Sequence, residues 1–223
     1  MDQCYIQSII QSYETDLKEI NQNGWVLQYV KEQTPELCLA AVKNYSGAIQ
    51  FVIKQTPELC MVAIRNDGRA LYYIRDQTPE LCLEAVKLCG NALEHVIQQT
   101  PEICLAAVQQ NGWAFQWVKE QTYEICLAAV QQNGLALQWV KEQTYEICLA
   151  AVKDVGHALQ LVKEQTYDIC VAAVQKSIGT LYHIKNPLLR EQLALEFKTT
   201  LPYRPEYNYN TLDIPRTNAA SFT

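Results

Sequence analysis

The segment TYEICLAAVQQNGLALQWVKEQ, residues 122–143, decides the fold because close copies of it follow one another through most of the chain. A threonine and a cysteine four residues later recur at intervals of 22 residues. An internal period of this size is typical of a solenoid, in which each unit buries its apolar face only against its neighbours. The seven pairs are Thr34 and Cys38, Thr56 and Cys60, Thr78 and Cys82, Thr100 and Cys104, Thr122 and Cys126, Thr144 and Cys148, and Thr166 and Cys170.

Each unit predicts two short helices, and the threonine marks the start of the first. The hydroxyl of Thr122 can accept a hydrogen bond from an unpaired backbone N–H, and the acidic Glu124 lies in the first turn, near the positive end of the helix dipole. Proline follows the threonine in the first four units and suits the first helical position, where its missing N–H is not needed. Tyrosine replaces it in the last three. These residues are Pro35, Pro57, Pro79, Pro101, Tyr123, Tyr145 and Tyr167.

A glycine follows the apolar run of the first helix in most units. Its position predicts a left-handed residue that ends the helix, and about eight residues after it, such as 135–142, predict the second helix. Gly47 and Gly179 fall one place late in their units. The regular glycines are Gly24, Gly68, Gly90, Gly112, Gly134 and Gly156.

The predicted fold is all-α: a right-handed α-solenoid of eight stacked 22-residue helix-turn-helix repeats with N- and C-terminal caps. Ser12 occupies the threonine position of a degenerate first repeat, so residues 1–33 are expected to form an N-terminal cap. Residues 34–187 are seven helical repeats, and residues 188–201 have the apolar spacing of a closing helix. Residues 202–223 are rich in Pro, Tyr and Asn, and we expect them to be extended or disordered.

The nine cysteines do not predict disulfides or a metal site. Cysteines in one column of adjacent repeats would lie about 10 Å apart, beyond the roughly 7 Å between α-carbons that a disulfide tolerates. No Cys-x-x-Cys occurs, and the three histidines lie on the other helix, so we expect no metal and no cofactor. The column cysteines are interpreted as small apolar core residues. Free thiols at this density are typical of a reducing compartment.

The longest apolar runs have six residues, too few to span a bilayer, and the amino terminus lacks a basic region before a hydrophobic stretch. We therefore expect a soluble intracellular protein that makes no contact with a membrane.

One column of the second helices changes its chemistry at every repeat. Positions that define a fold repeat with little change, so a freely varying column is expected to be exposed, and varied side chains on a regular scaffold are typical of a binding surface. The alternative is drift on a solvated face. The column, called the first column below, contains Trp25, Gly47, Arg69, Asn91, Trp113, Leu135, His157 and Gly179. The predicted partner-binding residues are Trp25, Arg69, Asn91, Trp113, Leu135 and His157.

Two further columns are interpreted as structural. The second column is bulky and mostly aromatic, which favours packing between successive second helices; its residues are Tyr29, Phe51, Tyr73, His95, Trp117, Trp139, Leu161 and His183. A glutamine precedes every threonine, and its amide can both donate and accept hydrogen bonds. We predict that stacked glutamines form a ladder that ties loop to loop. They are Gln33, Gln55, Gln77, Gln99, Gln121, Gln143 and Gln165.

The repeat TP-E-L/I-C-L-A-A-V-x-x-x-G-x-A-L-x-x-V-K-E-Q resembles a family of short two-helix repeats, domain of unknown function 4116, abundant in giant DNA viruses of amoebae. The resemblance covers residues 12–187, with tyrosine after threonine in the last three units as a departure. It implies a viral or host-manipulating protein of the host cytoplasm or the virion, and it supplies no catalytic residues. The matching positions in one unit are Thr100, Pro101, Glu102, Cys104, Ala106, Ala107, Gly112, Trp113 and Lys119.

Several functions remain open at this stage. The favoured one is a non-enzymatic scaffold that binds a protein or peptide, such as a host factor, through the second helices. A nucleic-acid reader is less favoured, because the net charge is −6 and acids accompany the basic column of Lys31, Arg75, Lys119, Lys141, Lys163 and Lys185. Self-assembly through the solenoid ends would give a homo-oligomer in place of a monomer. No nucleophile motif or acid pair breaks the period, so no enzyme is expected.

Overall fold

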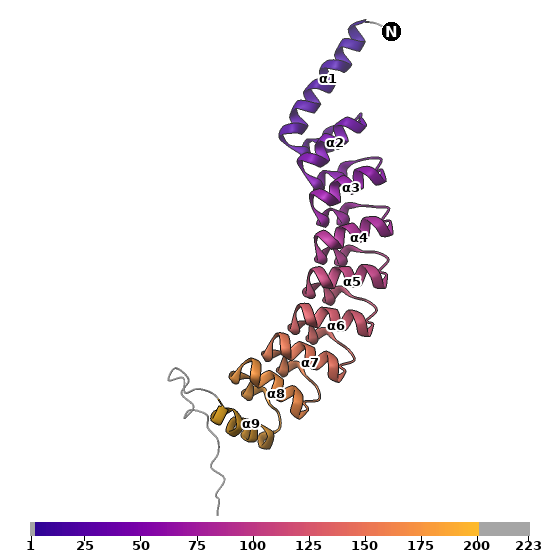
Figure 1. Cartoon of the computed structure of the whole chain (residues 1–223). Helices are drawn as coiled ribbons and strands as arrows, with labels where there is room; N and C mark the ends of the chain where they lie inside the picture. Colours follow the sequence, from indigo (N-terminus) through magenta and orange to yellow (C-terminus); the bar gives the residue numbers. More distant parts are fainter. Residues whose placement is uncertain (1–2, 201–223) are drawn as a thin grey trace, which may run out of the picture.

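The computed structural model describes residues 3–200, and it is a curved stack of repeats (Figure 1). Each repeat has one α-helix followed by one 3-10 helix, labelled η. The elements are α1 (Gln3–Gln22), η1 (Gly24–Tyr29), α2 (Pro35–Asn44), η2 (Ser46–Phe51), α3 (Pro57–Asn66), η3 (Gly68–Tyr73), α4 (Pro79–Leu88), η4 (Gly90–His95), α5 (Pro101–Gln110), η5 (Gly112–Trp117), α6 (Tyr123–Gln132), η6 (Gly134–Trp139), α7 (Tyr145–Asp154), η7 (Gly156–Leu161), α8 (Tyr167–Lys176), η8 (Ile178–His183) and α9 (Pro187–Thr200). The predicted helical solenoid is confirmed.

The threonines begin the α-helices as predicted. In each of α2 to α8 the threonine has an extended backbone, and its hydroxyl oxygen accepts from the backbone N–H three residues later at 3.3 to 3.5 Å. This bond satisfies one of the donors that a helix leaves unpaired at its start. The caps therefore set the register of every repeat.

The core runs without interruption along the stack. Consecutive α-helices contact each other, and so do consecutive η helices, which gives two parallel layers. In α6, the residues Ile125, Cys126, Ala129 and Val130 are buried, and η6 adds Ala136 and Leu137 from the opposite layer. The same positions are buried in nearly every repeat. The column cysteines are therefore apolar core residues, as predicted, and the described cysteines form no disulfide.

The second helix differs from the prediction in type and extent. It is a six-residue 3-10 helix that starts at the glycine position, where an α-helix of about eight residues starting after the glycine was expected. In η6 the capping residue is Asn133, whose backbone is extended, with φ −155° and ψ 107°. The pair Asn133 and Gly134 therefore begins the second helix.

The predicted left-handed glycine is wrong, because no glycine of the described chain has a φ in the left-handed region. The glycines are needed for space. A Cβ on Gly90 would lie 2.5 Å from the carbonyl oxygen of Ala107 in the next repeat, and one on Gly68 would lie 2.7 Å from that of Ala85. The same close approach occurs at Gly24, Gly112, Gly134 and Gly156. We call these α-to-η turns the glycine edge.

The two ends of the chain depart from the regular repeat. Ser12 does not cap a helix, because it lies inside α1, which runs from Gln3 to Gln22. The closing helix, expected at residues 188–201, is α9, Pro187–Thr200, and its Glu196 accepts from the hydroxyl of Tyr167 at 3.1 Å. The expectation of an extended or disordered tail at residues 202–223 lies outside the described residues.

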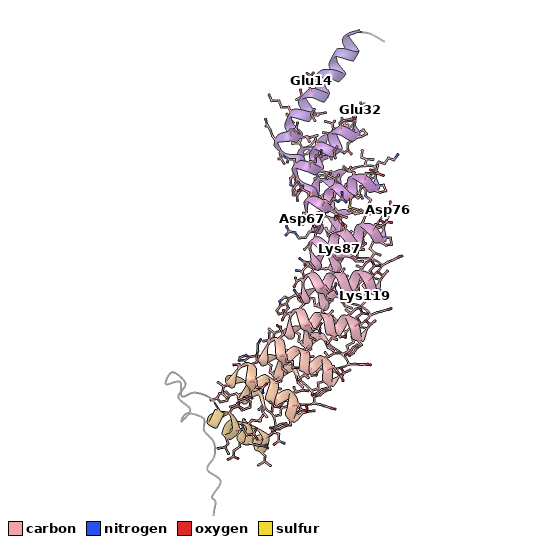
Figure 2. The ribbon with its side chains drawn as sticks, viewed as in Figure 1. Glu14, Glu32, Asp67, Asp76, Lys87 and Lys119 are labelled. Carbon is pink, nitrogen blue, oxygen red and sulfur yellow. The ribbon has the colours of Figure 1, made fainter. Side chains whose placement is uncertain are left out.

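The two sides of the arc carry different connections. Figure 2 shows Asp67, in the turn before η3, on the inner side of the curve, and Asp76 and Lys119, in loops after η helices, on the outer side. The glycine edge is therefore the inner side. The outer side is formed by the η-to-α loops, each of which contains a column glutamine, and we call it the glutamine edge.

Candidate interaction surface

The first column is exposed wherever its side chain is large and polar or aromatic. Trp25 and Trp113 are 43% and 41% exposed, which is high for tryptophan. Arg69, Asn91 and His157 are also exposed. Leu135 is half-buried, and the glycines at 47 and 179 are buried and half-buried. The expected exposure holds for five of the six predicted partner-binding residues, and the half-buried Leu135 is the exception.

In four of the eight described η helices, an Asn or Asp side chain two residues earlier caps the backbone of the first-column residue. The side-chain oxygen of Asn111 accepts from the backbone N–H of Trp113 at 3.1 Å, and that of Asn133 accepts from Leu135 at 3.0 Å. Asn23 and Asp67 cap η1 and η3 in the same way. The sequence analysis missed these positions. The Asn-Gly and Asp-Gly pairs at the starts of η1, η3, η5 and η6 were the available signal.

The carboxylate of Asp67 also accepts from the side chain of Arg69. The guanidinium of Arg69 donates to its carboxylate at 2.9 to 3.2 Å. The side-chain bond from Arg69 is the main cause that lowers the pKa of Asp67 below its ordinary value, while partial burial acts in the opposite direction. The pair places two opposite charges side by side on an otherwise mostly uncharged surface.

Aromatic rings join the two predicted columns across successive repeats. The rings of Trp113 and Trp139 meet edge to face with centroids 5.3 Å apart, and those of His157 and His183 lie 5.5 Å apart. Trp25 meets Phe51 at 5.2 Å. A first-column side chain thus packs on the second column of the next repeat. We call the combined surface of both columns the η face.

The second column is half-buried from Phe51 to His183, which agrees with packing between successive η helices. Tyr29 is the exception, since it is 77% exposed. No earlier repeat supplies a first-column residue to cover it. The second column therefore combines a packing role with partial access to solvent.

The glutamine column ties neighbouring repeats together, but by a different arrangement from the predicted ladder of stacked glutamines. The amide nitrogen of Gln143 donates to the backbone carbonyl of Leu161 at 3.1 Å, and its amide oxygen accepts from the backbone N–H of Lys163 at 2.9 Å. All seven glutamines make this pair of bonds to the next repeat. Each glutamine therefore bridges to backbone, not to another glutamine.

The basic column is partly engaged by the same loops. The ammonium of Lys163 donates to the carbonyl of Lys141 at 2.8 Å, and that of Lys185 donates to Val162 at 2.7 Å. Arg75 donates to the carbonyls of Val52 and Ile53. These cations stabilise the glutamine edge, and a phosphate would compete with the carbonyls for them.

The thiols of the cysteine column are poor candidates for chemistry. Burial is the main cause that raises the pKa of all seven above the ordinary thiol value, so the reactive thiolate is disfavoured at neutral pH. Among the described residues, no group of three or more His, Cys, Asp or Glu side chains is placed to hold a metal ion. None of the helices between residues 3 and 200 is long and apolar enough to cross a membrane.

A hollow of about 630 Å³ lies between the first halves of α2 and α3. Its lining includes Pro35, Leu39, Leu59 and Val62, and Leu59 is half-buried although its counterparts in the other repeats are buried. Ser46 occupies the glycine position of this repeat. The junction between this repeat and α3, which lacks the glycine, therefore also contains a hollow between its α-helices.

These features define a helical-repeat protein whose scaffold positions are fixed and whose η face varies. Two overlapping stretches, residues 78–122 and 101–143, match the family described as Domain of unknown function (DUF4116), and each match spans two consecutive repeats. The predicted resemblance to this family is confirmed over residues 78–143. The association with giant viruses stays a prediction. Comparison with curated proteins and with solved structures gives no match.

Proposed function

We propose that this protein is a non-enzymatic scaffold that binds a protein or peptide partner, such as a host factor, through the η face. The observation that carries the proposal is a contrast between neighbouring positions. Ala70, Ala92, Ala114, Ala136 and Ala158 are buried and identical, whereas the residues just before them are Arg69, Asn91, Trp113, Leu135 and His157. The scaffold is therefore constant directly beside a surface that changes at every repeat.

The exposed aromatic rings support a role in recognition. Tryptophan and arginine are the residue types most enriched among binding hot spots, and an exposed tryptophan gains most from burial against a partner. Trp113 lies edge to face against Trp139, so its ring is held in one orientation before any partner arrives. A surface ordered in advance loses less entropy on binding.

Free thiols and the charge pattern support two secondary parts of the proposal. Eight described cysteines are unpaired, which fits a reducing intracellular compartment. A nucleic-acid partner is disfavoured, since the cations of the basic column donate to loop carbonyls and the net charge is −6. The protein is proposed to act without a cofactor or a metal.

The test is affinity capture from a cell lysate with the natural chain and with a variant that carries Arg69→Ala, Trp113→Ala, Leu135→Ala and His157→Ala. The eluates are analysed for protein and for RNA. We expect the variant to lose one or more protein partners while its circular dichroism spectrum is unchanged. RNA whose capture declines with salt would support the nucleic-acid reading instead.

A matched control changes four exposed residues of the α layer: Lys87→Ala, Gln109→Ala, Gln131→Ala and Lys153→Ala. This variant keeps the η face, so it should capture the same partners as the natural chain. If both variants lose the same proteins, the η face has no special role. If neither loses any, attention moves to the solenoid ends and to self-association.

A further inference from the structure

The 3-10 helices η5 to η8 carry no charged side chain, as η1 and η2 also do not, and they hold three of the four tryptophans of the chain. The helices η5 to η8 read GWAFQW, GLALQW, GHALQL and IGTLYH, with no Lys, Arg, Asp or Glu. Earlier, η3 contains Arg69 and η4 contains Glu94. An uncharged surface of ordered rings is suited to an uncharged, rigid peptide better than to a charged one.

The indoles of this part of the η face offer unused hydrogen-bond donors. Within the described residues, no hydrogen bond forms from the ring N–H of Trp113, Trp117 or Trp139, and no buried side-chain polar atom lacks a partner. The ring N–H groups of the half-buried Trp117 and Trp139 are therefore not buried, and Trp113 is an exposed residue. Extended proline-rich peptides bind aromatic grooves through ring contacts and through their own unpaired carbonyls, which accept from such donors.

The chain itself contains a peptide of this chemistry. Residues 201–223 read LPYRPEYNYNTLDIPRTNAASFT, in which Pro202 and Pro205 form a Pro-x-x-Pro motif around Tyr203 and Arg204. Two arginines balance one glutamate and one aspartate, so the segment has no formal net charge. Pro-x-x-Pro motifs are typical of peptides that bind aromatic-lined grooves, and they do so at a low entropic cost.

The described chain ends at Thr200, within reach of this surface. The C-terminal end of α9 lies on the inner side of the arc in Figure 1, the side on which Figure 2 shows Asp67. The helix contacts η8, and its Glu196 accepts from Tyr167 of α8. The 23 residues after Thr200 can span about 70 Å in a polyproline II helix. Three repeat spacings of about 10 Å separate η8 from η5.

We propose that residues 201–223 bind the η face of their own chain between η5 and η8, with the Pro-x-x-Pro motif against the tryptophan rings, and that an outside partner has to displace them. The inference rests on the proposed use of the η face as a binding surface. It adds the chemistry of the ligand, a neutral Pro- and Tyr-containing extended peptide, and a built-in competitor for it. Because η5 to η8 carry no charged side chain with which Arg204 could form an ion pair, the contact should persist at high salt.

Photo-crosslinking of the purified full-length chain tests the proposal. Tyr203 is replaced by p-benzoylphenylalanine, the protein is irradiated in low and in high salt, and crosslinked peptides are identified by mass spectrometry. We expect crosslinks from position 203 to residues of η5 to η8 within a single chain, in both salt concentrations. The variant Pro202→Ala with Pro205→Ala should lower their yield roughly tenfold, equivalent to about 1.4 kcal/mol of contact free energy.

The controls separate the alternatives. The same photoreactive residue at Tyr123, which is exposed at the start of α6, should give no crosslink to residues 201–223. Crosslinks to η5 to η8 that appear only in a covalent dimer would overturn the proposal in favour of a second copy as the occupant. Crosslinks scattered over the α layer, or none to the η face, would also overturn it. Neither result affects the capture experiment, which uses outside partners.

Discussion

The two edges of the solenoid hold successive repeats together in opposite ways. At the glycine edge, the chain at Gly134 passes so close to the carbonyl of Ala151 that no side chain fits between them. At the glutamine edge, the side chain of Gln143 lies between two successive loops. It donates to the backbone carbonyl of Leu161 and accepts from the backbone N–H of Lys163, both in the next loop. One edge depends on a missing side chain, and the other on a polar side chain of fixed length.

This difference accounts for the curvature and for the freedom of the η face. Repeats approach more closely at the glycine edge, which is the inner side of the arc, and the glutamines keep the outer loops one amide side chain apart (Figure 2). Because the two edges and the buried core fix the stacking of the repeats, the stacking does not depend on which side chains occupy the exposed first column. Its residues can change from Trp113 to Leu135 to His157 without altering the stack.

The largest effect is expected at the glycine edge. Gly134→Ala places a Cβ against the carbonyl oxygen of Ala151, and because both belong to backbone, neither can move without separating η6 from α7. We expect a loss of about 3 kcal/mol in the free energy of unfolding, at the upper end of overpacking effects. Urea unfolding followed by circular dichroism measures it, and hydrogen exchange should show the loss centred on this junction.

Gly179→Ala is a control one position further along the corresponding turn, where Ile178 occupies the glycine position. The nearest atom to a Cβ at this position is the hydroxyl oxygen of Ser177, at 3.8 Å, so there is ordinary space for a methyl group. The change should alter the free energy of unfolding by no more than about 0.5 kcal/mol. Equal losses in the two variants would show that backbone conformation, and not close approach, explains the glycines.

An intermediate effect is expected at the glutamine edge. Gln143→Ala removes the donor to Leu161 and the acceptor for Lys163, but water reaches part of this loop and replaces some of the lost bonds. We expect a loss of about 1 to 2 kcal/mol, measured by the same urea titration. Gln138→Ala is the control, because this exposed glutamine bonds only to Leu135 of its own helix. An unchanged midpoint in Gln143→Ala would contradict the bridging role.

Much of this comparison could be predicted from the sequence. The period, the capping threonines, the buried cysteines and the exposed first column all follow from side-chain chemistry repeated at a fixed interval. A threonine that precedes an apolar run with an acid in its first turn, such as Thr122, is typical of a helix N-cap. The scaffold role of Gln143 was also predictable, because an amide kept in every repeat implies a repeated hydrogen bond.

The glycine edge could not be predicted, because its cause lies in the next repeat. A glycine after an apolar run most often ends a helix in the left-handed conformation. Here the deciding contact joins Gly134 to Ala151, 17 positions later, and it depends on the distance between two helices. The six residues from Gly134 to Trp139 are too few for a periodicity to separate an α-helix from a 3-10 helix.

The positions of the candidate surface were predicted from the sequence, but the contacts that join its two columns were not. The sequence showed two columns, and it did not show that Trp113 of one repeat meets Trp139 of the next. That contact depends on the stagger between successive η helices. The capping role of Asn111 was missed for the same reason as the glycine, since the pair Asn-Gly was interpreted as an ending rather than as a beginning.

The smallest effect concerns the charged pair on the η face, where pH provides the test. Arg69 lowers the pKa of Asp67 in the folded chain, so the pair contributes stability above the unfolded pKa of the carboxyl group and loses it as the pH falls through the lower folded value. Arg69→Ala should therefore lower the melting temperature at pH 7 by about 2 °C at most, because exposed pairs are weak.

The difference between the same variant and the natural chain should shrink as the pH falls and the carboxyl group of Asp67 becomes protonated in both. Thermal unfolding from pH 7 to pH 2 measures this convergence, and Arg69→Lys serves as the control that keeps the charge but loses the two-atom contact. A constant difference at all pH values would mean that Arg69 acts by covering apolar surface. In that case a first-column residue also stabilises the stacking of the repeats. The η face would then not vary independently of the scaffold.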